Sequence, residues 1–263
     1  MADNKSDIWL WDVPAAFVLL TRLPLPALPD HAFAQGGRAV WAYPLVGLVL
    51  GGMAAVLGAV LSGLGLPAML VAGLVLAALV MLTGAMHEDG LADTADGLWG
   101  GHTAARRLEI MRDSRIGAYG VLALVLGTGL RWRGYAEVSG AELVAALVVS
   151  RAAMPPLMAT LPHARSDGLS RSVGRPGMGP AAIALGLAAL IALGLTGAGA
   201  VTALLVGAGA ALGMALLARA KIGGQTGDIL GATQIVVEIA VLITFIALCA
   251  THEKAAPEPR TRQ

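Results

Sequence analysis

Long apolar stretches alternate with shorter polar connections along the chain. A helix that crosses a bilayer needs about 20 predominantly apolar residues, and windows of this kind occur at about seven positions. The predicted spans are Ala39–Gly63, Leu66–Met86, Ile116–Leu130, Ala141–Leu161, Pro180–Gly197, Ala200–Ala218 and Ile229–Ala250. The pattern therefore predicts an all-α, polytopic integral membrane protein with about seven transmembrane helices.

The polar parts of the chain divide this single membrane domain, residues 1–263, into further segments. Residues 1–38 are predicted to lie along the membrane interface, and residues 87–115 form a long, Asp-rich segment that we interpret as catalytic. Residues 251–263 are predicted to be a disordered tail. Two shorter polar connections are rich in glycine and charge: His163–Gly177 and Arg219–Asp228.

Composition supports the membrane assignment. Hydrophobic residues make up 57% of the chain and charged residues only 13%, with 35 glycines that would allow close helix packing. The net charge of +1 and the absence of a basic run with interleaved aromatic residues argue against a nucleic-acid partner. Cys249 is the single cysteine, which excludes disulfides and cysteine-based metal sites within the chain.

Basic residues are distributed unequally between the two sides of the seven-span topology. One side holds Lys5, Arg22, Arg38, Arg106, Arg107, Arg112, Arg115, Arg165, Arg171, Arg175, Arg219 and Lys221, and the other holds Arg131, Arg133, Lys254, Arg260 and Arg262. Because cytoplasmic loops carry the excess of Lys and Arg, the polar connections are predicted to face the cytoplasm. The prediction is a multi-pass protein of the cell inner membrane with its active site on the cytoplasmic side.

Three carboxylates in the Asp-rich segment are spaced as on one face of a helix. Asp89, Asp93 and Asp96 follow one another at intervals of four and three, which places them within roughly 60° of each other at about 100° per residue. Their mutual repulsion would favour a bound cation. The alternative, a solvated acidic face, is disfavoured because their neighbours are Gly, Ala and Leu and provide no ion pairs.

Oxygen ligands of this kind favour hard divalent cations. With no thiolate available and His87 as the nearby imidazole, the set suits Mg²⁺, Ca²⁺ or Mn²⁺ better than Zn²⁺. Mg²⁺ held by carboxylates and substrate phosphates is typical of phosphoryl transfer. We therefore predict that Asp89, Asp93 and Asp96 are Mg²⁺ ligands.

Arginines and a glycine-rich turn near the segment suit phosphate groups. Thr103 is predicted to begin an interfacial helix, and guanidinium groups can bind phosphates through two parallel hydrogen bonds. The candidates on and after that helix are Arg106, Arg107, Arg112 and Arg115. In the connection before the last span, Gln225, Thr226 and Asp228 precede a helix whose amino-terminal amides favour anions.

Several motifs together resemble one family, the cobalamin synthases or adenosylcobinamide-GDP ribazoletransferases. The resemblance extends from about Phe17 to Glu238 and is most specific in the third and fourth of its blocks. These blocks are FVLLTRLP (17–24), YPLVGLVLGG (43–52), TGAMHEDGLADTADG (83–97), LEIMRDSRIGAYG (108–120), Ser150-Arg151, LPHARSDGL (161–169) and GGQTGDILGA (223–232). Glu88 departs from the family pattern, which carries an apolar residue there in many members.

The resemblance implies a Mg²⁺-dependent transfer of adenosylcobinamide phosphate from adenosylcobinamide-GDP to α-ribazole or its 5′-phosphate, with release of GMP. Asp89, Asp93 and Asp96 would hold the metal, and His87 or one of these carboxylates would take the acceptor proton. Substrate-binding roles would extend to Arg22, Arg151 and Arg165, which lie in the shared motifs. Homo-oligomerisation and association with other cobalamin-assembly enzymes are left open.

Two other functions are compatible with parts of the pattern. A CDP-alcohol phosphotransferase also carries an Asp-Gly start and later Asp residues on membrane helices, but Leu91-Ala92-Asp93 does not fit its spacing. A transporter could use Arg151 and the Asp cluster to bind its substrate within the membrane. The sequence shows no inverted repeat of hydropathy, and its polar groups gather at one face.

The topology can be tested with reporter fusions. Because the basic residues concentrate on one side, a reporter fused after Gly101 should report the cytoplasm and one fused after Glu253 the periplasm. Paired alkaline phosphatase and fluorescent-protein fusions measure both positions. If both positions report the same compartment, one span has been misassigned, most readily the short one that begins at Ile116.

Overall fold

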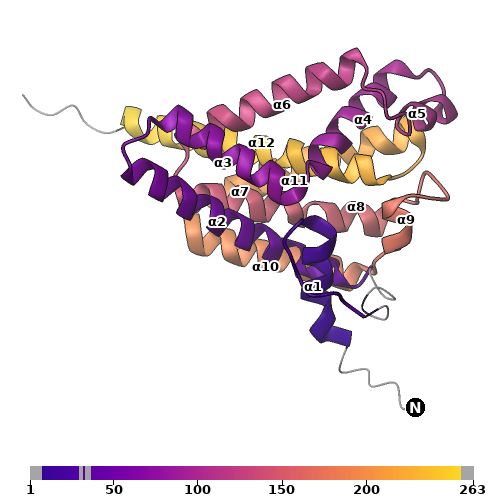
Figure 1. Cartoon of the computed structure of the whole chain (residues 1–263), viewed down its shortest axis with the longest axis horizontal. Helices are drawn as coiled ribbons and strands as arrows, with labels where there is room; N and C mark the ends of the chain where they lie inside the picture. The colour runs from indigo at the N-terminus through magenta and orange to yellow at the C-terminus, as the bar shows by residue number, and fades with distance from the viewer. Residues whose placement is uncertain (1–7, 30–31, 33–36, 256–263) are drawn as a thin grey trace, which may run out of the picture.

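The computed structural model describes residues 8–29, 32 and 37–255. Within this part the chain is helical and forms no strand; the one isolated bridge joins His163 and Gln225. The elements are α1 (Ile8–Leu20), η2 (Ala39–Ala42), α2 (Tyr43–Gly63), α3 (Ala68–Thr83), α4 (Met86–Gly100), α5 (Ala104–Ile110), α6 (Ala118–Glu137), α7 (Gly140–Ala152), α8 (Met154–Thr160), α9 (Leu169–Val173), α10 (Met178–Thr196), α11 (Gly199–Ile222) and α12 (Gly227–Ala255). Figure 1 shows most of the long helices running in similar directions.

The all-α, multi-pass prediction is confirmed, with a smaller span count in the described residues. Five helical stretches are long and apolar enough to cross a membrane, or six if α3 and α4, bent by 87°, form one span. The stretch predicted from Ile116 corresponds to α6, which does not meet this criterion. It begins and ends later than predicted and includes Arg131 and Arg133.

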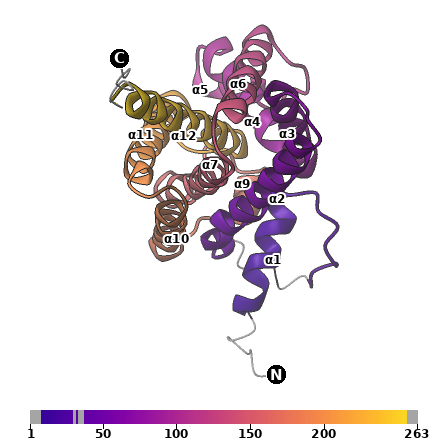
Figure 2. The same ribbon diagram turned by 90° about the vertical axis from the view of Figure 1, so that its left-hand side faces the viewer.

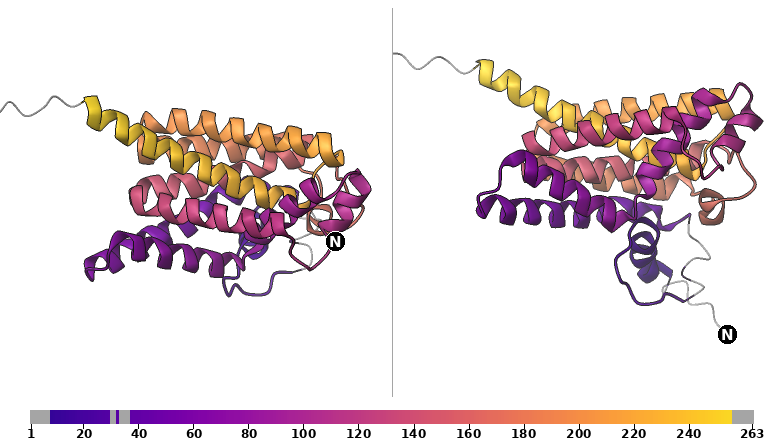
Figure 3. Two further views of the ribbon diagram at one scale, coloured as in Figure 1. Left: turned by 90° about the horizontal axis from the view of Figure 1, so that it is seen from above. Right: turned by 45° about the horizontal axis from the view of Figure 1, so that its top comes forward.

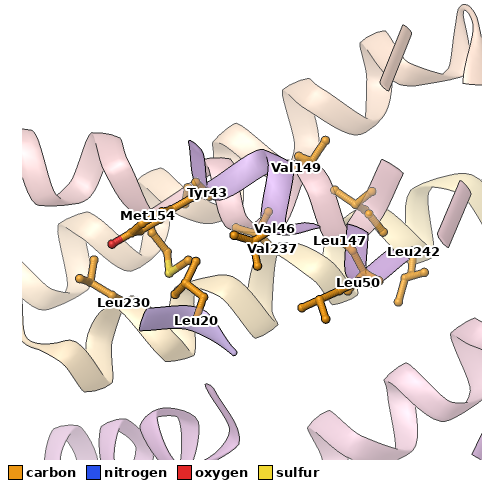
Figure 4. Close-up of a cluster of buried hydrophobic side chains, with 14 of the residues drawn as sticks. Leu20, Tyr43, Val46, Leu50, Leu147, Val149, Met154, Leu230, Val237 and Leu242 are labelled. Atoms are coloured by element: carbon orange, nitrogen blue, oxygen red, sulfur yellow. The ribbon is translucent and has the colours of Figure 1, made fainter. Parts of the chain in front are cut away.

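Helix α7 lies at the centre of the bundle, and α10 and α11 lie at its periphery (Figure 2). Helices α7 and α8 together form one apolar stretch, Gly140–Thr160, and 89% of its most apolar window is buried inside the protein. The corresponding windows of α10 and α11 are each only 22% buried. A helix that is apolar on all sides suits either a protein core or lipid. The core therefore centres on α7, and α10 and α11 present large apolar surfaces to the bilayer. Figure 4 shows part of this core.

Close packing of α2 on α7 depends on two glycines. Gly47 lies against the backbone of Leu147, and Gly51 lies against Val144. A Cβ atom at either glycine would clash with α7. Small residues four apart let membrane helices approach closely, because van der Waals packing takes over where lipid weakens the hydrophobic effect.

The polar connections gather at one end of the bundle (Figure 1, Figure 3). Arg107 of α5 donates to the carbonyl of Lys221 at 3.0 Å, and Ala164 donates to the carbonyl of Gln225 at 2.9 Å. At the same end, Asp12 of α1 pairs with Arg38 at 2.9 Å and accepts from the indole of Trp41. This arrangement agrees with the predicted one-sided topology.

Inside the bundle, Arg131 of α6 joins two acids from other helices. Its Nη1 contacts Glu88 of α4 at 2.5 Å, and its Nε contacts Glu238 of α12 at 2.7 Å. Glu238 also accepts from Tyr135 at 2.5 Å and from Gln234 at 2.7 Å. We call these five residues the Arg131 cluster. The cluster fixes the three helices relative to one another, since each buried charge needs its partners.

Two expectations need correction here. Arg131 was assigned to an outer connection, but its side chain is buried and 5% exposed. The helix, not the apolar run, extends past Leu130 to Glu137, and the charge of Arg131 is neutralised within the protein by Glu88 and Glu238. The tail predicted to be disordered from residue 251 overlaps α12, which continues to Ala255; residues 256–263 lie outside the described part.

Removing Glu238 should destabilise the protein strongly. Glu238→Ala takes one carboxylate from a buried arginine, and breaking a buried pair costs about 3–5 kcal/mol. Glu88→Ala should lower the stability less, because Arg131 would still form its ion pair with Glu238. Glu137→Ala is the matched control, since Glu137 pairs with Arg133 on the exposed side of the same helix, where a pair contributes about 0–1 kcal/mol. Thermal unfolding of the detergent-solubilised chain measures all three. Equal midpoints for Glu238→Ala and Glu137→Ala would remove this role of the cluster.

Candidate active site

Helix α4 begins at a sharp turn that directs it away from α3. Gly84 and Ala85 both have positive φ angles, of 65° and 57°. Among the described residues, Ala85 is the only one other than glycine with a positive φ. A positive φ is unfavourable for alanine, so the surrounding packing must hold the turn. The turn produces the 87° bend that lays α4 at the polar end of the bundle.

The helix predicted for the Asp-rich segment is confirmed, and its three aspartates lie at different depths. Asp89 is exposed, Asp93 is half-buried and Asp96 is buried. Asp93 is close enough to Asp89, Asp228 and Asp96 to be affected by their negative charges. The acidic face therefore runs from the surface into the protein.

Asp96 caps helix α6. Its carboxylate accepts the backbone N–H of Gly117 at 2.6 Å and that of Gly120 at 2.9 Å. A Cβ atom on either glycine would clash with the carboxylate, so the paired glycines permit this contact. A negative charge at the amino end of a helix is stabilised by unpaired amides and by the helix dipole.

A cavity of about 460 Å³ opens beside the exposed end of the acidic face. We call it the first cavity. It brings together five of the residues predicted from the sequence, which come from α4, from the connections that follow α5 and α8, and from α12. They are His87, Asp89, Arg112, Arg165 and Asp228. Arg112 also pairs with Asp167 at 2.6 Å across this polar part of the wall.

Asp228 lies in the first turn of α12 and forms an ion pair with Arg165. Thr226 donates to the same carboxylate at 3.2 Å and accepts the backbone N–H of Ile229. Thr226 thus caps α12 and is not on the wall of the first cavity. Asp228 and Arg165 are held in place, with Asp228 available to the cavity.

Gln225 is buried and ties two connections together instead of lining the first cavity. Its side chain accepts from Ser170 at 2.6 Å and contacts Nδ1 of His163 at 3.2 Å, and its backbone bonds Pro162 and Ala164. His163 has a pKa below its usual value, first because of burial and then because of Arg171 and Arg175. This contact fixes the segment that carries Arg165.

The remaining predicted arginines lie outside the first cavity. Arg106 pairs with Glu109, and Arg107 donates to backbone carbonyls of Leu98 and Lys221. Arg115 hydrogen-bonds to Asp113 and holds the pKa of that carboxyl at about 2.

Arg151 and Arg22 have different surroundings. Arg151 is 2% exposed and donates to the carbonyl of Leu147 at 3.1 Å, whereas its Nε has no partner among the described residues. Arg22 is exposed at the wall of a second cavity of about 430 Å³. Neither arginine lines the first cavity.

The carboxylates of α4 are suitable ligands for a hard divalent cation, but the structure does not gather them into a complete metal site. Within the described residues, no group of three or more His, Cys, Asp or Glu side chains is arranged to hold a metal. Asp96 is already engaged at α6, whereas Asp89 and Asp93 have no hydrogen bond or ion pair within the described residues. Carboxylate oxygens such as these fit Mg²⁺, which usually completes its shell with water and substrate oxygens.

Sequence reasoning did not identify several residues that shape the site. Glu238 could have been found as an acid within an apolar span, which usually has a partner or a function. Tyr43 and Met158 line the first cavity but look like ordinary core residues in the sequence. Asp167 lay within a quoted motif without an assigned role.

Comparison with known proteins gives a consistent result. The family model for cobalamin-5-phosphate synthase matches residues 12–246. The adenosylcobinamide-GDP ribazoletransferase of Bradyrhizobium diazoefficiens is 46% identical over 242 residues, covering 90% of this chain and 93% of the relative. The protein of the same name from Mesorhizobium japonicum is 43% identical, covering 88% of this chain and 91% of the relative. The one from Rhizobium meliloti is 42% identical, covering 92% of this chain and 97% of the relative. No solved structure matches the chain.

Asp96→Ala should lower stability through the loss of its cap. Removing a capping side chain costs about 0.5–2 kcal/mol, and here the amides of Gly117 and Gly120 both lose their acceptor. Gly120→Ala should act in the same direction, because the new Cβ would displace the carboxylate. Asp89→Ala, on the same face of α4 but exposed, should leave the thermal midpoint near that of the original protein. Matching midpoints for Asp96→Ala and Asp89→Ala would contradict the capping role.

Proposed function

Because this chain belongs to the cobalamin-5-phosphate synthase family, we propose that it transfers adenosylcobinamide phosphate from adenosylcobinamide-GDP to α-ribazole or its 5′-phosphate. The names of its relatives support these substrates. The observation that carries the proposal is the polar part of the first cavity, where Asp89, Arg112 and Arg165 converge. Together they offer acidic and basic groups suited to a pyrophosphate.

The reaction is a displacement at phosphorus. A hydroxyl oxygen of the acceptor bonds to the cobinamide-side phosphorus, and the bond from that phosphorus to the bridging oxygen of GMP breaks. The hydroxyl proton passes to a base, and GMP leaves with the electron pair of the broken bond. Positioning and charge neutralisation contribute most to such a transfer.

Arginines at the first cavity would bind and orient the phosphates. Arg112 is half exposed and paired with Asp167, so it can exchange this surface contact for a phosphate. Arg165 is largely buried beside Asp228, where its planar group keeps a fixed orientation. Charge on the departing GMP would be stabilised by these guanidinium groups.

Asp89 and Asp93 would hold Mg²⁺, with Asp228 beside them. Mg²⁺ would neutralise phosphate oxygens and favour departure of GMP. Asp96 would support this set by fixing α4 against α6. We therefore propose Asp89 and Asp93 as the metal ligands and a supporting role for Asp96, which accepts two backbone amides.

His87 or one of the carboxylates beside it would serve as the base. His87 lines the first cavity, and its buried Nε2 has no hydrogen-bond partner among the described residues. A neutral imidazole with a free nitrogen can accept a proton within hydrogen-bond reach of the acceptor hydroxyl. We further infer from the excess of basic residues at this end that the site faces the cytoplasm from the inner membrane.

The reaction can be assayed in membranes that contain the chain, with adenosylcobinamide-GDP and α-ribazole supplied with and without Mg²⁺. Cobalamin and GMP should form together and only with the metal. Asp89→Asn and Asp93→Asn should each lower turnover about 100-fold or more, because the loss of a ligand charge removes several kcal/mol of stabilisation.

Glu109→Gln is the matched control, since this exposed acid pairs with Arg106 and lines neither cavity. It should retain normal turnover. Absence of both products from folded, Mg²⁺-supplied protein would refute the proposed reaction. Normal turnover in both Asp variants would instead refute the assigned ligands.

A further inference from the structure

The first cavity has two chemically different parts. Its polar part carries the acids and arginines described above. Its other wall is apolar and consists mainly of side chains from α1, α2, α8, α9 and α12: Leu19, Leu20, Tyr43, Met154, Met158, Val173 and Leu230. Figure 4 shows that Leu20, Tyr43, Met154 and Leu230 lie near one another within the hydrophobic cluster. The core therefore continues into the wall of the cavity.

The volume of the first cavity limits what it can enclose. About 460 Å³ is within the range of pockets that bury most of a drug-sized molecule. A nucleoside fits this range, whereas the corrin macrocycle with its nucleotide is several times larger. The donor can therefore place its pyrophosphate at the polar part but cannot enter as a whole.

The apolar wall also distinguishes between the two nucleosides of the reaction. Guanine carries polar groups along its edge that need hydrogen-bond partners when buried. The base of α-ribazole is a dimethylbenzimidazole, whose methyl groups and aromatic faces suit leucine, valine and methionine side chains. Resting on the proposed function, we propose that the apolar part of the first cavity binds the benzimidazole base of the acceptor.

Tyr43 supplies a polar contact for this base. Its hydroxyl forms no hydrogen bond within the described residues, although the side chain is only 3% exposed and lines the first cavity. A glycosylated benzimidazole keeps one ring nitrogen that accepts a hydrogen bond and none that donates. A tyrosine hydroxyl can donate to this nitrogen, which orients the ribose toward Asp89 and Arg165.

Two adjacent residues of α1 provide matched variants. Leu19 lines both cavities, whereas Val18 lines only the second cavity. Leu19→Trp should fill the apolar part and weaken α-ribazole binding about 10-fold or more, because the indole would occupy the space that the base needs. Val18→Trp should leave this binding within about 2-fold. Equilibrium dialysis of labelled α-ribazole against the detergent-solubilised full chain measures the affinity without turnover.

Tyr43→Phe provides a test that does not depend on a bulky substitution. Loss of one hydrogen bond should weaken α-ribazole binding about 3- to 10-fold. GMP binding, measured in the same way, should be unchanged in Leu19→Trp and Tyr43→Phe. Thermal unfolding of each variant verifies that it is folded.

The outcomes separate the site from the reaction. Weakened GMP binding with unchanged α-ribazole binding would overturn the assignment, and so would equal weakening of α-ribazole binding in the Leu19 and Val18 variants. If the original protein binds α-ribazole, and the variants weaken this binding as expected, but no cobalamin forms, the proposed reaction is refuted and the proposed binding site is supported. If the original protein forms cobalamin but all variants bind α-ribazole normally, the proposed binding site is refuted and the proposed reaction is supported.

Discussion

The buried charge of Arg131 constrains the whole arrangement of helices around the site. An arginine within an apolar bundle is stable only with its partners in place, and here the partners come from α4 and α12. Helix α4 carries Asp89 and Asp93, and α12 carries Asp228 in its first turn. The same ion cluster that makes α6 compatible with its apolar surroundings therefore sets the relative positions of Asp89 and Asp228 at the first cavity and of Asp93 near them.

A second set of contacts fixes the direction of α4. The turn at Gly84 and Ala85 begins the helix, and Asp96 near its end is held by amides of α6. Between these anchors, Asp89 and Asp93 keep no hydrogen bond or ion pair within the described residues. This difference has a physical reason: a buried carboxylate must be satisfied by the protein, whereas exposed or half-buried ones can remain available to a cation or a substrate.

Much of the fold follows from hydropathy, and part of the site follows from helix periodicity. The apolar windows located the long helices, and the spacing of Asp89, Asp93 and Asp96 predicted the helix that carries them. The pattern could not show that Arg131 is neutralised from two distant helices, because that pairing depends on tertiary packing. Likewise Gln225 and Thr226 resemble ligand-binding residues in a glycine-rich turn, but the structure uses them to join connections and to cap α12. Composition of a loop does not distinguish these uses.

The position of the first cavity relates the membrane architecture to the chemistry. Its polar part is formed by the ends of helices and their connections, where phosphates and a cation can keep water as a partner. Its apolar part is formed by side chains of α1, α2, α8, α9 and α12, where the hydrophobic core reaches the cavity. In this protein the helical bundle provides the apolar wall of the cavity, and the short helices and connections at its end provide the charged groups. The charged and the apolar parts of the first cavity therefore come from different elements of one fold, the short helices and connections for the first and the bundle for the second.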